Sequence, residues 1–249
     1  MSAEKRNTQL SQQLQQELVD FTYIVSHDLS APIRHIEQFS MLLSQRLADR
    51  NVLNAEEQQF LDILKSSSHR ARAMVAALHK LSRLNTAEME WSSIDLPKLL
   101  GRIQTELSRN FRDRNFLMIF DDSVQEIEAD KNSFHFAISA VIENAIRFAS
   151  GDTPTEITVH SQLDGDYIEI DITDNGKGIS SDLAERVFQC FFQENPDKND
   201  LEHLGVGLTG ARRAIRRHHG DITIECGSND YGWPRIRLPI KQSGSQISS

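Results

Sequence analysis

The chain has 249 residues, of which 39% are apolar and 25% charged, a composition that predicts a globular protein with one large or two modest domains. Its formal net charge of −9 argues against nucleic acid or an anionic membrane as a partner, because both attract basic surfaces. The two cysteines, Cys190 and Cys226, form no CxxC pattern, so neither a disulfide framework nor a zinc site is predicted. No run of about 18 apolar residues is present, so we expect a cytoplasmic protein without membrane insertion.

The first third of the chain shows helical spacing of apolar residues in two long runs. The first extends over Leu14–Leu47 and the second over Phe60–Leu84, with the polar segment Asn51–Asn54 between them. Two long helices joined by a short loop form an antiparallel hairpin. Because one hairpin buries too little apolar surface to be stable alone, we expect a homodimer in which two hairpins make a four-helix bundle.

A histidine lies beside a carboxylate inside the first helical run, in the segment Ser26–Pro32 (SHDLSAP). The Asp28 carboxylate can hold the imidazole of His27 in one tautomer and raise the nucleophilicity of its other nitrogen. Helical geometry aims His27 away from the apolar stripe, and Pro32 predicts a bend because its nitrogen has no proton to donate. The pattern favours His27 as an accessible nucleophile, and a surface ion pair is the alternative interpretation.

Beyond Trp91 the periodicity changes to short strands and helices. A linker at Ser92–Asp95 is expected to end in the N-cap of a helix over Leu96–Leu107. Strands are predicted at Phe116–Phe120, Glu156–His160, Tyr167–Thr173, Asp221–Glu225 and Arg235–Ile240. Further helices are predicted at Asn132–Phe148, Asp182–Phe188 and Gly207–His218, and a hairpin turn at Asp164–Asp166.

The predicted fold class is α+β, because a helical hairpin precedes a region in which strands and helices are mixed. We expect a dimerising hairpin over residues 1–90, an α/β sandwich over 91–241 and a polar tail over 242–249.

Two glycine-rich segments predict a nucleotide site in the second domain. The segment Asp174–Ile179 (DNGKGI) follows a predicted strand, and Gly205–Gly210 (GVGLTG) opens a predicted helix whose exposed amides attract phosphate. Glu143 and Asn144 could supply the oxygen ligands that Mg²⁺ prefers. Each feature alone is equally typical of an ordinary turn, helix start or solvated helix face. Their occurrence together favours a nucleotide.

These segments, in this order, resemble the conserved boxes of sensor histidine kinases. That family joins a dimerisation and histidine-phosphotransfer hairpin to an ATP-binding domain of the GHKL type, and the similarity covers about residues 10–241. The segments that resemble the H, N, G1, F and G2 boxes are His27–Pro32, Val141–Phe148, Asp174–Ile179, Phe188–Phe192 and Gly205–Leu208.

The resemblance implies a protein kinase that uses ATP to phosphorylate its own His27, with Asp28 and Glu143 as catalytic partners. It implies that the phosphoryl group then passes to an aspartate of a response-regulator receiver domain. Asp174 would bind the adenine amino group, and Asn144 would coordinate Mg²⁺.

The resemblance also implies a mobile lid over Glu194–Leu204, anchored by Phe188, Phe191 and Phe192. No sensory domain is evident, so we expect the signal to come from a separate sensor protein or from a missing N-terminal sensor. The other nucleotide-binding residues that the resemblance implies are Arg147, Gly176, Gly178, Gly205, Gly207 and Leu208.

Three positions depart from the family's pattern. Ala140 stands where the N box usually begins with Asn, and His203 stands where the G2 box commonly has an earlier glycine. Ala31 replaces a Thr or Asn that would position water, so we expect weak phosphatase activity towards a phosphorylated partner. The departures leave open a catalytically weak, kinase-like binding module that regulates another kinase or response regulator. A chaperone-like or DNA-repair-type GHKL ATPase is a third interpretation, which leaves the histidine motif without a use.

Overall fold

The computed structural model describes residues 28–47, 54–86, 88–149, 153–194 and 204–240. The chain divides into two compact units, one containing Met1–Ala87 and the other containing Glu88–Glu194 with Gly205–Ser249. None of the described helices is both long and apolar enough to cross a membrane.

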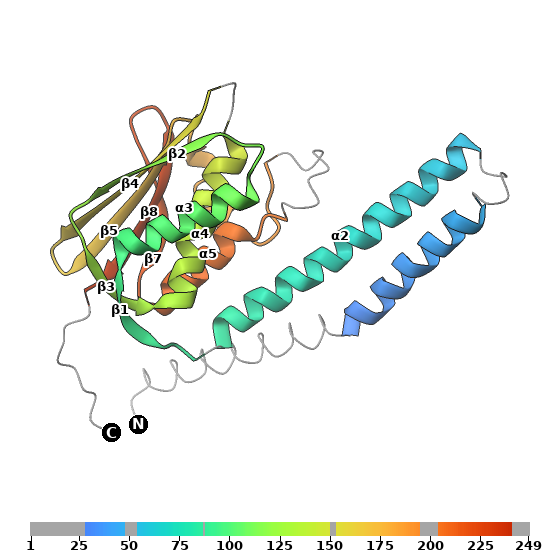
Figure 1. Cartoon of the computed structure of the whole chain (residues 1–249), viewed down its shortest axis with the longest axis horizontal. Helices are drawn as coiled ribbons and strands as arrows, with labels where there is room; N and C mark the ends of the chain where they lie inside the picture. The colour runs from blue at the N-terminus through green and yellow to red at the C-terminus, as the bar shows by residue number, and fades with distance from the viewer. Residues whose placement is uncertain (1–27, 48–53, 87, 150–152, 195–203, 241–249) are drawn as a thin grey trace. The chain divides into compact units, whose positions relative to one another are not determined.

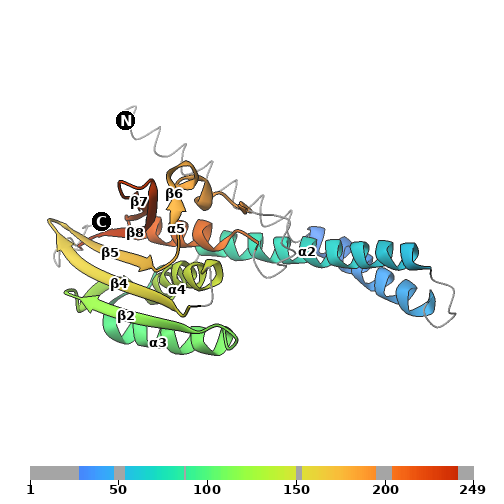
Figure 2. The ribbon, with the colours of Figure 1, turned by 90° about the horizontal axis from the view of Figure 1, so that it is seen from above.

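In the first unit the described residues form two helices, residues 28–47 and α2 (Ala55–Thr86), which lie side by side (Figures 1 and 2). An ion pair of 2.9 Å between Arg72 Nη1 and Glu37 Oε2 joins the two helices. The first helix stays helical through Pro32. These elements confirm the two predicted helices, although the part of the first helix before residue 28 lies outside the described residues.

A capping box fixes the start of α2. The Asn54 side-chain oxygen accepts a hydrogen bond from the Glu57 backbone N–H at 2.8 Å, and Glu57 Oε2 accepts one from the Asn54 N–H at 2.9 Å. The helix therefore begins where the polar segment of the sequence ends.

The second unit contains a six-stranded sheet in the order β2-β4-β5-β8-β6, with β7 also paired to β8. Strands β2 and β4 are parallel and the other pairs of this sheet are antiparallel. The strands are β2 (Phe116–Asp122), β4 (Thr155–Asp164), β5 (Tyr167–Asp174), β6 (Ile179–Ser180), β7 (Asp221–Cys226) and β8 (Tyr231–Pro239). A separate antiparallel pair is formed by β1 (Trp91–Asp95) and β3 (Glu126–Asp130).

Helices α3 (Leu96–Asn110), α4 (Lys131–Phe148) and α5 (Gly207–Arg217) cover one face of this sheet (Figure 2). The side chains of Asp95 and Asp130 cap α3 and α4 by accepting hydrogen bonds from backbone amides of the first turn. Fully buried side chains of α3, α4, α5 and the sheet form the core between the layers: Leu100, Ile103, Phe134, Ile138, Ile142, Ile146, Ile157, Ile170, Ile172, Ile215 and Ile222.

Two segments differ from their predictions. Residues 92–95 belong to β1 rather than to a linker, because exposed Ser92 and Ser93 precede a single buried Ile94 and the strand is completed only by pairing with β3. The predicted helix over Asp182–Phe188 is replaced by two 3₁₀ turns, η1 (Ser181–Leu183) and η2 (Arg186–Phe188). The α+β class itself is confirmed, with the helical hairpin and the mixed sheet both present.

Candidate functional site

Asp174 is the last residue of β5 and lies half-buried at the end of the strand. Its Oδ1 accepts a hydrogen bond from the Gly176 backbone N–H at 2.8 Å. Burial raises the pKa of this carboxyl above its usual value, while the Gly176 amide and the Trp233 side chain act in the opposite direction. The position thus holds a partly desolvated acceptor with capacity for a further donor.

At Gly176 and Gly178, which follow Asp174, neighbouring atoms lie so close that a side chain would collide with them. A Cβ on Gly176 would lie 2.6 Å from Asp174 Oδ1, so a side chain there would displace the carboxyl. Gly178 has a φ of +74°, and a Cβ there would meet the Gly232 carbonyl oxygen at 3.0 Å. Both predicted glycine positions therefore shape the loop beside Asp174.

Asn175 has a structural role that the sequence did not reveal. Its side-chain oxygen accepts from the Glu156 N–H at 3.0 Å, and its backbone N–H donates to the Glu156 carbonyl at 3.1 Å. Its amide group also donates to the Pro154 carbonyl at 3.1 Å. These bonds fasten the loop to the start of β4, which leaves Asp174 at a fixed place.

The expected lid over Glu194–Leu204 is described only at its ends, because residues 195–203 lie outside the described part. Lys177 Nζ approaches Glu194 Oε1 at 3.3 Å, which links the glycine loop to the first residue of the expected lid.

The two ends of that segment meet at a narrow neck. The Phe191 N–H donates to the Gly205 carbonyl at 2.9 Å, and a Cβ on Gly205 would collide with the Phe192 carbonyl oxygen. Phe191 has a φ of +64°, a left-handed conformation that is uncommon for a bulky residue and recurs at functional sites. Phe191 and Phe192 thus act through their backbone as well as through their rings.

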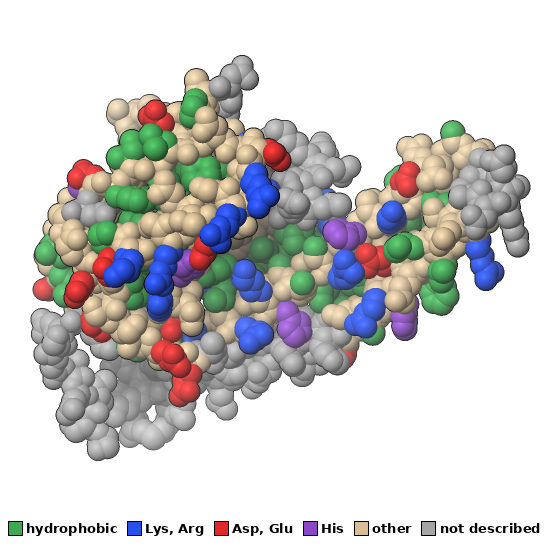
Figure 3. Space-filling view, viewed as in Figure 1, with side chains coloured by type: hydrophobic (Ala, Val, Ile, Leu, Met, Phe, Trp, Pro, Cys, Tyr) green, Lys and Arg blue, Asp and Glu red, His purple; other side chains and the backbone are tan. Residues whose placement is uncertain are grey.

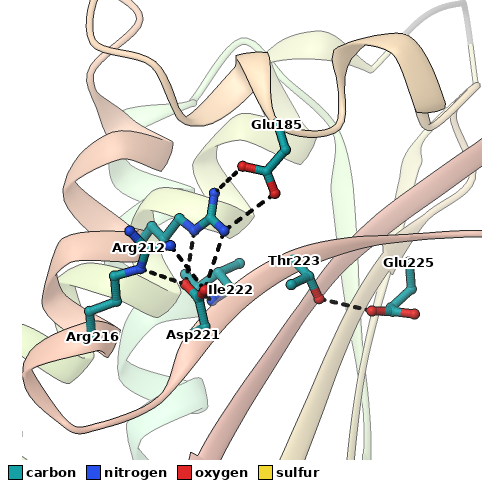
Figure 4. A network of polar contacts seen from close by, with 7 residues as sticks. All are labelled: Glu185, Arg212, Arg216, Asp221, Ile222, Thr223 and Glu225. Atoms are coloured by element: carbon teal, nitrogen blue, oxygen red, sulfur yellow. Dashed lines mark hydrogen bonds and ion pairs between the residues drawn. The ribbon is translucent and has the colours of Figure 1, made fainter.

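Arg212 of α5 holds η2 and the start of β7 (Figure 4). Its guanidinium donates to both carboxylate oxygens of Glu185, at 2.7 and 3.3 Å, and to those of Asp221, at 2.9 and 3.2 Å. It also stacks over the buried Phe188 ring, with Cζ 4.6 Å from the ring centroid. Although burial opposes it, hydrogen bonding from Arg212 and Arg216 holds the pKa of Asp221 down at about 2.

The N-terminus of α5, where an anion site is predicted, has no capping side chain. Val206 at the N-cap position provides no side-chain hydrogen bond to the first turn. Thr209 in this turn is 6% exposed, and its hydroxyl has no hydrogen-bond partner among the described residues. A Cβ on Gly207 would be 4.0 Å from the Cβ of buried Ala140, so the glycine start of α5 lies against α4. Leu208 is 7% exposed and belongs to the core.

The candidate metal-site residues lie on α4. Glu143 and Asn144 are both half-buried, and their side chains carry oxygen atoms. Glu143 Oε1 accepts from Arg147 Nη2 at 3.1 Å, and Arg147 Cζ stacks 5.4 Å from the centroid of Phe111. Arg147 is therefore held by Glu143 and Phe111, and its nucleotide-binding role stays a prediction.

The candidate phosphoacceptor belongs to the other unit. His27 lies outside the described residues, and Asp28 is the first described residue of the helix over 28–47, where it is exposed. The structure thus groups the glycine loop, Asp174 and the α5 terminus within one unit. Trp233 on β8 is the neighbour of this group that sequence analysis missed, since its strand was expected to start after Pro234.

Comparison with known proteins gives one family match and many relatives. Residues 129–243 match the family model described as histidine kinase-, DNA gyrase B- and HSP90-like ATPase. Heme sensor protein HssS of Staphylococcus saprophyticus is 26% identical over 211 residues, which are 84% of this chain and 44% of HssS. Sensor-like histidine kinase SenX3 of Mycolicibacterium smegmatis is 26% identical over 210 residues, which are 82% of this chain and 53% of SenX3. The chain thus spans about half the length of these relatives.

A solved structure of full-length ShkA in complex with AMPPNP has a similar fold. The TM-score is 0.60 with 19% sequence identity, over 89% of this chain and 46% of ShkA. At this identity the likeness concerns the fold alone.

Proposed function

We propose that this chain, whose residues 129–243 form a domain of the histidine kinase-, DNA gyrase B- and HSP90-like ATPase family, is the kinase core of a sensor histidine kinase. In the proposed reaction His27 accepts the γ-phosphoryl group of ATP and passes it to an aspartate on a response-regulator receiver domain. The observation that carries the proposal is the Asp174 carboxyl, held by the Gly176 amide at 2.8 Å in a domain of this family.

Recognition of adenine follows from the chemistry of Asp174. A carboxylate oxygen accepts a hydrogen bond from the exocyclic amino group of adenine, whereas guanine presents a carbonyl oxygen at the same ring position. Oδ1 is already engaged by Gly176, which orients the carboxyl and leaves acceptor capacity for the base. The residues present therefore fit an adenine nucleotide.

The phosphates and Mg²⁺ are assigned to the helices beside this loop. The first turn of α5 has no capping side chain, and its backbone amides are donors that suit a phosphate oxygen. The amide oxygen of Asn144 is a ligand that Mg²⁺ accepts, with Glu143 beside it on α4. When bound, Mg²⁺ neutralises phosphate charge during transfer.

The residues near His27 prepare it for phosphoryl transfer. In the proposed step Nε2 of a neutral His27 forms a bond to the γ-phosphorus while the bond to the ADP oxygen breaks. Asp28 keeps the remaining ring proton on Nδ1 and offsets the positive charge that develops on the ring. The transfer depends mainly on holding His27 and the γ-phosphoryl group of ATP in the right geometry. The presence of the hairpin and the ATPase domain in one chain serves that positioning.

A homodimer is part of this proposal, because the helical unit leaves apolar side chains open to solvent (Figure 3). A second copy of the hairpin would cover them in a four-helix bundle. Along the first helix and α2, side chains between 44% and 69% exposed include Leu29, Ile36, Phe39, Leu43, Phe60, Ile63 and Leu64.

The experiment is incubation of the purified protein with Mg²⁺ and γ-labelled ATP. We expect acid-labile label on the protein, its loss in His27→Ala and its retention in His35→Ala, a matched control on the exposed surface of the same helix. Asp174→Asn should also remove the label, since it places an amino group where the adenine amino group would bind. Acid-stable label, or label that survives His27→Ala, would contradict the proposal.

A catalytically weak binding module is the second candidate, and it has one specific observation behind it. Ala140 is 8% exposed against the start of α5, where an amide side chain would otherwise be available to the nucleotide. ATP binding without any label on His27, measured in the same experiment with a purified receiver domain present, would favour this second function.

A further inference from the structure

The indole of Trp233 lies against the glycine loop that follows Asp174. A Cβ on Gly178 would be 3.3 Å from Trp233 Cζ2 and 3.4 Å from Cε2. Strand pairing fixes this contact, because Ile179 of β6 is paired with Gly232, the residue before Trp233. The opposite edge of the same strand is paired with β7, where Glu225 is the partner of Trp233. The backbone that carries the ring is thus paired on both edges.

The N–H group of this indole is buried without a hydrogen-bond partner in the structure. A buried donor that remains unpaired destabilises the structure, so such groups are uncommon unless a partner arrives. The nearby acceptor is the Asp174 carboxyl: burial raises the pKa of this carboxyl above its usual value, and its interaction with Trp233 opposes that rise. The donor and the acceptor are therefore neighbours that have not yet formed a well-aligned hydrogen bond.

The Asp174 carboxylate can serve three donors at once. Oδ1 accepts from the Gly176 N–H, and a carboxylate has lone pairs for about four hydrogen bonds. An adenine amino group and the Trp233 N–H can both be added without displacing Gly176. Each added donor also favours the ionised form, which burial alone disfavours.

We propose that Trp233 is a positioning residue of the nucleotide site, whose indole N–H donates to the Asp174 carboxylate when that carboxylate holds the adenine amino group. This inference rests on the proposed function, since it requires an adenine nucleotide at Asp174. Trp233 sets the orientation of Asp174 and acts on the nucleotide through it. The ring itself remains packed on Gly178.

The test compares Trp233→Phe with the wild-type full chain, using ATP and purine riboside 5′-triphosphate. The second nucleotide lacks the amino group and cannot donate to Asp174. We expect Trp233→Phe to weaken ATP binding about 10- to 150-fold, the loss of one hydrogen bond to a charged group. Binding of purine riboside 5′-triphosphate should change less than about 2-fold, because in that complex the Trp233 N–H does not donate to Asp174 even in the wild type.

Three outcomes would overturn the inference. An equal loss of affinity for both nucleotides would show that the ring acts only by packing, and unchanged affinity for ATP would show that the N–H is not used. If the wild type binds both nucleotides equally well, recognition of the amino group by Asp174 is itself wrong, and the proposed function fails at that point rather than at Trp233.

A second measurement does not depend on whether Trp233→Phe folds. The chain has two tryptophans, and Trp91 stacks edge-on against His218 with ring centroids 5.3 Å apart, in β1. In Trp91→Phe the fluorescence comes from Trp233 alone. We expect ATP to shift its emission maximum and purine riboside 5′-triphosphate to leave it within experimental error. An identical shift with both nucleotides, or none with ATP, would contradict the proposed hydrogen bond.

Discussion

His218 uses both ring nitrogens to tie the end of α5 to the start of α4. Nδ1–H donates to the Ala214 carbonyl at 2.8 Å, and Nε2 accepts from the Asp130 N–H at 3.0 Å. A carbonyl can only accept and an amide can only donate, so these partners define a neutral ring with its proton on Nδ1. Burial lowers the pKa of His218, Arg217 lowers it further, and the Asp130 carboxylate and the hydrogen bond to Ala214 oppose the shift.

The free energy of unfolding should therefore fall in acid because of this one histidine. Above its ordinary pKa of 6.5 the ring is neutral in both states and contributes no pH dependence. Below 6.5 the unfolded chain binds a proton that the native ring resists, so stability falls until the pH reaches the lowered native pKa.

The expected slope from His218 is at most about 1.4 kcal/mol per pH unit, the limit for one proton. His218→Gln keeps a donor and an acceptor but does not titrate, so its unfolding free energy should change less between pH 7 and 5. His160→Gln is the control, because His160 is partly exposed beside Asp121. Urea unfolding at several pH values measures the slopes, and identical slopes in wild type and His218→Gln would contradict the expectation.

Residues that act through local backbone geometry were predictable from the sequence. Asp174 and Gly176 stand two residues apart, so their contact follows from the turn itself. Trp233 and His218 were missed because their roles depend on partners far away in the chain. Trp233 meets Gly178 only through the pairing of β6 with β8, and His218 meets Asp130 across 88 positions.

At the scale of elements, α5 and the turns before the lid are joined through Arg212. Its side chain is 12% exposed, and it satisfies Glu185 and Asp221 while covering Phe188. Arg216, also bonded to Asp221, is 57% exposed. The pair offers a matched comparison, because both are arginines on the same helix with a shared partner.

Arg212→Met should lower the free energy of unfolding by about 2 kcal/mol. The substitution removes the hydrogen bonds of Arg212 to Glu185 and to Asp221, and of the two arginines only Arg216 stays bonded to Asp221. Arg216→Met should cost less than about 1 kcal/mol, as expected for an exposed pair. Urea unfolding gives both values, and titration with ATP should show weaker binding in Arg212→Met. Equal effects of the two substitutions would show that the link to η2 contributes nothing.

Long elements with a clear period were predicted well, and short ones were not. Helix α4 repeats fully buried residues every four positions, from Phe134 to Ile146, so its pattern is visible in isolation. Strand β1 has one buried residue, Ile94, and depends on β3 for its hydrogen bonds. Asp182–Phe188 was expected to be one helix, yet the chain there forms two short turns, and Phe188 is anchored by Arg212, a contact that the local sequence does not reveal.

At the scale of the whole molecule, the apolar surface of the hairpin predicts self-association. Phe39 is 69% exposed, the largest value among the exposed large hydrophobic side chains of the described residues. Phe39→Glu would place a charge in the proposed bundle, where its desolvation is unfavourable. Sedimentation equilibrium should show a dimer for the wild type and a monomer for this variant.

Gln38→Glu adds the same charge one position away on the exposed surface of the helix and should leave the dimer intact. A dimer that persists in Phe39→Glu, or a monomeric wild type, would contradict the bundle.

The neck at Phe191 and Gly205 has a further consequence for what this architecture can accommodate. The chain leaves and re-enters the domain at one hydrogen bond of 2.9 Å, so Phe191 and Gly205 stay together whatever the length of chain between them. Closing a loop becomes costlier only slowly as it lengthens, by about 0.6 kcal/mol for each doubling. The neck is thus a natural splice point, where a foreign peptide could be grafted or a segment lengthened over evolution while the surrounding layers keep their packing.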